Sequence, residues 1–294
     1  MTVLSRNQIE LRADTDDALV VGPGTDFQWV REGPKWWAGA DVREFDEARG
    51  GADGYTPGRD LLGRHATPLQ VQIRAVSQAD LAAKIDAWKA ATAISADDLV
   101  AARARLLTDE TRVRYGRFRV PGEVGGEDAA RARFAVGSAQ FVTFDGLTYS
   151  DEVHELSTGR VTGGAGFTPP FVPPFTLGAG TAGSLAAANA GNTTGWWEAT
   201  LTGPLDQPVI EHLESGLRLA FTANGGVDLS AGQTLVLDSR RRSALLNGTA
   251  DRLTQLSVDR DWWGLSHLAV TTFRLTAGDG AGQLRVRWRD AYHS

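Results

Sequence analysis

The five histidines are the first side chains to weigh for catalytic or metal chemistry, because imidazole titrates near neutral pH and binds transition metals. They are scattered along the chain at His65, His154, His212, His267 and His293. None forms an i, i+4 pair or a tight cluster with acidic residues, which a zinc or di-iron site would require. The sequence therefore predicts no metal centre.

Other reactive constellations also lack the context that they need. A serine hydrolase with a G-x-S-x-G elbow is not predicted, because the chain contains no such motif. Gly163, Gly164 and Gly166 resemble a phosphate-binding loop, but Pro169 and Pro170 follow them where a helix should begin. A wall-degrading enzyme would need two positioned carboxylates or a metal, and neither is identifiable. We expect no enzyme and no cofactor.

Tryptophan supplies the strongest candidates for a binding surface, because it occurs in three adjacent pairs. The pairs are Trp36 and Trp37, Trp196 and Trp197, and Trp262 and Trp263. Adjacent side chains of a strand point to opposite faces, so one indole fills the core and something else must cover the other. Three interpretations stay open: packing within the chain, a protein interface, and a platform on which sugars stack.

The arginine run at residues 240–242 follows Asp238 and Ser239 and joins two predicted strands. Such a run is usually a solvated turn. It could equally meet an acidic surface on a partner, because guanidinium groups pair well with carboxylates.

The bulk properties narrow the class of protein further. A length of 294 residues predicts about two domains, and a net charge of -6 argues against a protein that grips nucleic acid. The absence of cysteine excludes disulfides and thiolate metal sites, as expected for folding in a reducing compartment. No apolar run approaches the roughly 20 residues that cross a bilayer, and no secretion signal is visible, so we expect no membrane insertion.

The first half of the chain predicts a β-rich domain with one or two helices. Ser77 with Asp80 forms a capping pattern before Leu81, Ile85 and Trp88, which share one helical face. A second helix is predicted over 96–107, and Gly116 is expected to mark a β-bulge. Predicted strands cover 3–11, 17–21, 26–30, 69–76, 112–120, 131–136 and 139–144.

The second half predicts an antiparallel β-sandwich. Leu284, Val286 and Trp288 alternate with arginines, which is typical of a strand with one buried and one wet face. Further predicted strands at 195–202, 208–212, 216–223, 234–238 and 261–275 are separated by turn-forming residues. The fold class is therefore mainly β with a small helical part. The domains expected are 1–158, a Gly- and Pro-rich connector over 159–175, and a sandwich over 176–294.

This order of features resembles the distal tail proteins, or minor tail proteins of that type, of long non-contractile-tailed bacteriophages, particularly those of actinobacterial hosts. The resemblance covers nearly the whole chain. In the first half it rests on GYTPGRDLLGR leading into LQVQIRAVSQADLAAKIDAWKAAT. In the second half it rests on TLVLDSRRRSALLNG, DWWGLSHL and the terminal WRDAY.

The resemblance implies a structural virion component at the tail tip, assembled in the host cytoplasm. The first domain would form a homohexameric ring that joins the tail tube protein to the tail-tip hub and tape-measure-associated proteins. Genomic DNA would only pass through the lumen, and a galectin-like sandwich domain would project outwards. The alternative function is a carbohydrate-binding module for host-wall recognition, in which Trp196 or Trp263 presents its ring to a sugar.

Overall fold

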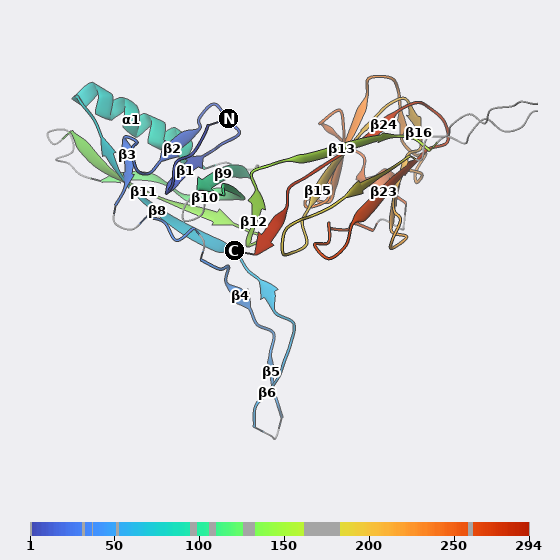
Figure 1. Ribbon diagram of the computed structural model, residues 1–294, viewed down its shortest axis with the longest axis horizontal. Coiled ribbons are helices and arrows are strands. Elements are labelled where there is room, and N and C mark those ends of the chain that lie inside the picture. Colours follow the sequence, from blue (N-terminus) through green and yellow to red (C-terminus); the bar gives the residue numbers. More distant parts are fainter. Residues whose placement is uncertain are drawn as a thin grey trace, which may run out of the picture. The chain divides into compact units, whose positions relative to one another are not determined.

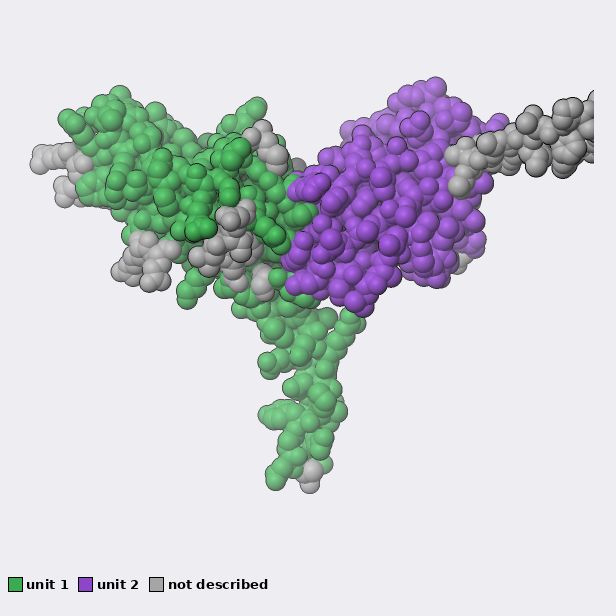
Figure 2. All heavy atoms as spheres, in the orientation of Figure 1, with its two compact units in different colours: residues 1–151, 293–294 green, residues 152–292 purple. Residues whose placement is uncertain are grey.

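The computed structural model describes residues 2–30, 33–36, 38–50, 53–94, 99–105, 110–125, 133–161, 183–257 and 261–293. Two compact units are present: unit 1 comprises residues 1–151 and 293–294, and unit 2 comprises residues 152–292 (Figure 2). The sequence placed the end of the first domain at residue 158. In the structure unit 2 begins at Glu152, and the strand over 154–159 belongs to it. Most of the predicted connector, from residue 162 onwards, lies outside the described residues.

Unit 1 is built on an antiparallel sheet with the strand order β2-β1-β9-β10-β11-β8-β3, and β12 pairs with β10 (Figure 1). A two-stranded hairpin between β3 and β8 is formed by the pairs β4–β7 and β5–β6. The strands of unit 1 are β1 (Gln8–Leu11), β2 (Leu19–Val21), β3 (Phe27–Trp29), β4 (Val42–Arg43), β5 (Glu47–Ala48), β6 (Tyr55–Thr56), β7 (Leu61–Leu62), β8 (His65–Arg74), β9 (Val100–Arg105), β10 (Arg112–Gly125), β11 (Phe134–Thr143) and β12 (Leu147–Ser150).

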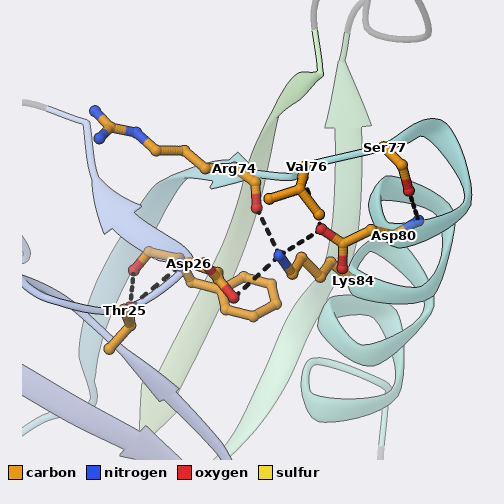
Figure 3. A network of polar contacts seen from close by, with 8 residues as sticks. Thr25, Asp26, Arg74, Val76, Ser77, Asp80 and Lys84 are labelled. Atoms are coloured by element: carbon orange, nitrogen blue, oxygen red, sulfur yellow. Dashed lines mark hydrogen bonds and ion pairs between the residues drawn. The ribbon is translucent and has the colours of Figure 1, made fainter.

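Helix α1 (Gln78–Ala91) begins where the sequence predicts it. The Ser77 hydroxyl accepts a hydrogen bond from Asp80 N at 3.1 Å, and the Asp80 carboxylate accepts one from Val76 N at 2.8 Å. Lys84 Nζ binds Asp80 at 2.8 Å, Asp26 at 3.0 Å and the carbonyl of Arg74 at 3.0 Å (Figure 3). This network satisfies the first turn of the helix and ties it to the end of β8.

The helix covers the inner face of the sheet through one large side chain. Trp88 is fully buried, with Leu81 and Ala91 beside it on the same helical face. The indole lies against two glycines: a Cβ at Gly137 would come within 2.8 Å of Trp88 Nε1, and one at Gly122 within 2.6 Å. Glycine is therefore required at both positions for the helix to approach the sheet this closely.

The variant Gly137→Ala is expected to destabilise unit 1 by about 1–3 kcal/mol, because the added methyl group overpacks the slot that holds Trp88. Gly125→Ala on the neighbouring strand is the matched control, since a Cβ there meets nothing within 4 Å. Hydrogen exchange of the β8 and β11 amides measures both variants. Equal opening free energies for the two would contradict this packing account.

Two predictions for unit 1 are wrong. Residues 100–105 of the predicted second helix form strand β9, which is buried on both faces and pairs with β1 and β10. Gly116 is also not a bulge, because it pairs regularly with Thr143, and the register shifts lie after Phe118. A Cβ at Gly116 would meet Val142 O at 2.4 Å, so this glycine permits close strand approach.

Unit 2 consists of two antiparallel sheets, in the orders β13-β24-β15-β20-β21-β22 and β14-β23-β17-β18, with a ribbon of β16 and β19. One buried cluster draws side chains from both sheets, among them Leu201 and Leu284 of the first and Ile210 and Phe273 of the second. The predicted sandwich is present. Its elements are β13 (His154–Gly159), β14 (Ser184–Ala187), β15 (Trp197–Thr202), β16 (Leu205–Asp206), β17 (Val209–His212), β18 (Arg218–Ala220), β19 (Asp228–Leu229), β20 (Thr234–Asp238), β21 (Ser243–Leu246), β22 (Ala250–Asp251), a 3-10 helix (Leu253–Gln255), β23 (Thr271–Thr276) and β24 (Gln283–Trp288). The last strand, β25 (Ala291–His293), is not part of these two sheets.

Strand β24 shows the predicted alternation: Leu284, Val286 and Trp288 are buried, while the arginines between them are exposed. It pairs along its whole length with β13, from His154 opposite Trp288 to Gly159 opposite Gln283. The incoming and outgoing strands of unit 2 are therefore neighbours in one sheet. Residues 261–270, predicted to begin a strand, form only a single bridge to Gly195 at Leu265.

Candidate interaction surfaces

Of the first tryptophan pair, Trp36 belongs to the core of unit 1. Its ring is fully buried and stacks on Phe141 with the centroids 6.0 Å apart. Trp37 lies outside the described residues. Trp36 therefore presents no ring face to a partner in this structure.

The other two pairs converge at one end of the sandwich. Trp197 and Trp263 are buried, with centroids 5.2 Å apart, and both pack on Phe273. Trp197 Nε1 donates a hydrogen bond to the carbonyl of Trp263 at 2.9 Å, and the His212 ring stacks on Trp263. These contacts join the strand β15 to the segment before β23, so the two indoles stabilise the core.

Trp196 and Trp262 are the half-buried members of their pairs. Trp262 packs on Trp197 at 6.3 Å, so one of its faces is used within the chain. In both pairs one indole is thus buried and the other is partly open, although of these four residues only Trp197 lies in a strand. A sugar-stacking or protein-contact role for Trp196 and Trp262 stays a prediction.

The arginine run forms the tight turn between β20 and β21. Asp238 Oδ1 accepts hydrogen bonds from the backbone N–H groups of Arg240 at 2.8 Å and Arg241 at 2.9 Å, and Arg242 has a φ of 53°. The local geometry is that of a turn capped by the Asp238 side chain. This turn explains the residues at 238–242 without a binding role for the arginines.

A surface that the sequence did not single out lies on the hairpin between β3 and β8, here called the arm (residues 38–50 and 53–64). Every described side chain from Asp41 to Asp60 is exposed, and the hairpin projects from the rest of unit 1 (Figures 1 and 2). Its apolar members are Val42, Phe45, Tyr55 and Leu62, with 52%, 54%, 65% and 37% of their surface exposed. The Gly-rich sequence at 50–54 was the available signal.

Unit 1 also contains a buried ion-pair network. Arg103 binds Glu10 at 2.5 Å and Asp151 at 2.6 Å, and these hydrogen bonds, with Asp151 the stronger cause, raise the pKa of the guanidinium. Arg103 lines a small pocket with the N-terminal residues 2–4. Because its charge is already paired, Arg103 serves to fix β1 and β9 rather than to receive a ligand.

The structure does not bring the histidines together. His65 is buried in unit 1, His154 binds Asp290 at 3.1 Å, and His212 contacts Ser215 and Glu214. His267 and His293 are exposed. Over the described ranges, no three His, Asp or Glu side chains are placed to hold a metal ion.

None of the helices in the described part of the chain has the length and apolar character of a membrane span.

Two carboxylates face each other in the ribbon of unit 2. Asp206 lies directly opposite Asp228, and a hydrogen bond between the two side chains, with burial and the charge of Asp279 added, raises the pKa of Asp206. Raising a carboxyl pKa on folding means that the folded state binds the proton more tightly than the unfolded chain. The pair therefore destabilises unit 2 at neutral pH, and this effect disappears as the pH falls through the pKa of Asp206.

The variant Asp228→Asn is expected to stabilise unit 2 at pH 7, because the amide removes one charge and can donate a hydrogen bond to Asp206. The gain should shrink as the pH falls through the raised pKa of Asp206, because the wild-type side chain then carries its proton. Urea unfolding of both proteins at pH 7 and pH 3.5 measures the difference. A gain that is equal at the two pH values would exclude the carboxylate pair as its cause.

The fold and these surfaces define a class: a two-unit, mainly β protein in which a helix-covered sheet carries an exposed hairpin and a β-sandwich follows. Residues 190–292 match the family model for the siphovirus-type tail component, C-terminal domain. The resemblance of the chain to siphovirus-type distal tail proteins is thereby confirmed. No curated protein matches the sequence.

Solved structures share the fold over nearly the whole chain. The SPP1 Dit (gp 19.1) protein, described as a paradigm of the hub adsorption apparatus in phages that infect Gram-positive bacteria, matches with a TM-score of 0.52 and 12% identity, covering 90% of this chain and 93% of its own. A chain of the phage p2 baseplate in its activated conformation with Ca matches with a TM-score of 0.56 and 8% identity, covering 97% and 98%. The same baseplate with Sr gives 0.53 and 8%, covering 96% and 97%.

Proposed function

We propose that this chain is a non-enzymatic adaptor of a siphovirus tail tip, in which identical copies, six in number, form a ring. The ring joins the tail tube to the tail-tip hub, and the galectin-like sandwich projects outwards. It is assembled in the host cytoplasm and resides in the virion. The family match of residues 190–292 and the fold shared with a hub protein and a baseplate chain support this role.

The observation that carries the proposal is the exposure of the arm. A two-stranded hairpin without a covered apolar face is marginally stable in water. The arm nevertheless exposes two aromatic rings, Phe45 and Tyr55, and no side chain of this part of the described structure covers them. Such a hairpin gains stability when it packs on another molecule, and in a ring of identical copies the neighbour is always present.

The charge of the chain is consistent with a passage for DNA. A net charge of -6 repels phosphates rather than capturing them, so nucleic acid passing through a ring would not adhere. That the acidic side chains line the passage is part of the proposal.

Replacing Phe45 and Tyr55 of the arm together with serine is expected to weaken self-association of the purified full chain by about tenfold or more. Buried aromatic anchors carry a large share of an interface's binding free energy, and a factor of ten corresponds to about 1.4 kcal/mol. Mass photometry and light scattering over a concentration series measure the effect, and electron microscopy of the wild type shows whether rings form.

Leu268→Ser is the matched control, because Leu268 is 83% exposed but lies in unit 2. It should leave association unchanged, and circular dichroism should show all variants folded. A wild-type chain that stays monomeric at high micromolar concentration would argue against the ring. An arm variant that associates as well as the wild type would remove the arm from it.

A further inference from the structure

A charged side chain is buried in unit 1 without a polar partner. Arg114 lies on β10 opposite Ala102, on the same side of the sheet as the core residue Phe118, and is fully buried. Its Cζ lies 5.2 Å from the centre of the Trp36 ring. Within the described structure, no group accepts a hydrogen bond from its Nε, Nη1 or Nη2 atoms.

No carboxylate of the described structure forms a hydrogen bond with this guanidinium. Asp145 acts on it only through its charge, while its two oxygens accept hydrogen bonds from Leu147 N at 3.2 Å and the Tyr149 hydroxyl at 2.8 Å. Burial lowers the pKa of Arg114 to about 10, so the side chain still carries its charge at neutral pH. A buried charge ordinarily requires a counter-charge and hydrogen-bond partners.

The groups around Arg114 share this deficit. The buried Trp36 Nε1 and Thr67 Oγ1 atoms also have no hydrogen-bond partner among the described residues. Thr67 pairs with Phe141, on which Trp36 stacks, so the three side chains gather at one end of the inner face. Guanidinium and indole N–H groups are donors only, and the threonine hydroxyl can donate. His65 Nε2, also buried without a partner among the described residues, is the one acceptor of this group, so donors and positive charge are in excess.

His65 lies beside the site and reports on its charge. Its Nδ1 contacts the carbonyl of Gly39 at 3.2 Å, which fixes the proton of the neutral ring on Nδ1. Burial, and after it the charge of Arg114, lowers the pKa of His65. A negative charge placed next to Arg114 would oppose the second of these effects.

We propose that Arg114, Trp36 and Thr67 bind a small monovalent anion, a halide or a carboxylate of the size of formate, at the root of the arm. The ion supplies an acceptor and a negative charge in addition to that of Asp145, whereas water supplies only the acceptor. Because Arg114 is fully buried, the proposal is limited to small ions. Binding would hold Trp36 on the inner face of the sheet, independently of the ring proposed above.

The test compares chloride with a bulky sulfonate buffer anion at equal ionic strength, using the full chain. Chloride should slow hydrogen exchange of the β10 amides around Arg114, about tenfold at a concentration near ten times its dissociation constant. It should also raise the pKa of the His65 ring, followed by NMR. Arg114→Met should abolish both responses. Arg119→Met, which removes an exposed arginine of the same strand that lies over Phe144, should retain them.

Equal effects of chloride and the sulfonate would overturn the proposal, because they would reflect screening alone. So would unchanged responses in Arg114→Met, or a His65 pKa that chloride does not move in the wild type. The responses are expected to be independent of protein concentration. Protection that instead rises with protein concentration without added chloride would assign the site to a carboxylate of a second copy and exclude a free ion.

Discussion

The contact between the Trp88 indole and the glycines of two strands is the interaction on which unit 1 depends. A long sheet must cover its apolar inner face, and here a single helix does so. The helix can approach because Gly122 and Gly137 leave room for the ring, and it is aligned because Lys84 joins its first turn to Asp26 and the end of β8. The apolar side chains of the hairpin between β3 and β8 take no part in this core and are exposed.

The two buried arginines of unit 1 show opposite solutions to the same problem. Arg103 is buried with two carboxylates within hydrogen-bond distance, so its charge is balanced inside the unit. Arg114 is buried against an aromatic ring and lacks that balance. The two arginines therefore differ in whether a carboxylate binds the buried guanidinium, and nothing in the sequence around either residue indicates this difference.

Local patterns predicted the parts of the fold that local forces decide. The cap at Ser77, the buried face of α1 and the alternation of β24 are correct because each depends on residues a few positions apart. Strand β9 was missed because VAARAR has good helix formers and no period of two. Its conformation depends on pairing with β1 and β10, and its Arg103 binds Glu10 and Asp151, which lie far away in the sequence.

The candidate site was predictable only in part, for the same reason. Adjacent tryptophans indicated that one member of a pair would be buried, and Trp197 and Trp263 are. That these two indoles would meet each other depends on the closing of the sandwich, which no short window contains. The arm escaped notice because its residues lack any periodic apolar pattern. The arm matters for the proposed function because the rest of unit 1 leaves its aromatic side chains exposed.

The pairing of β13 with β24 has a consequence for how such proteins diversify. Because the chain enters and leaves the sandwich on neighbouring strands, a continuous genetic segment encodes a module with adjoining ends. Recombination that exchanges this segment can replace the module without re-routing the chain of unit 1. The exchanged segment would carry its own hydrophobic core, separate from the core of unit 1.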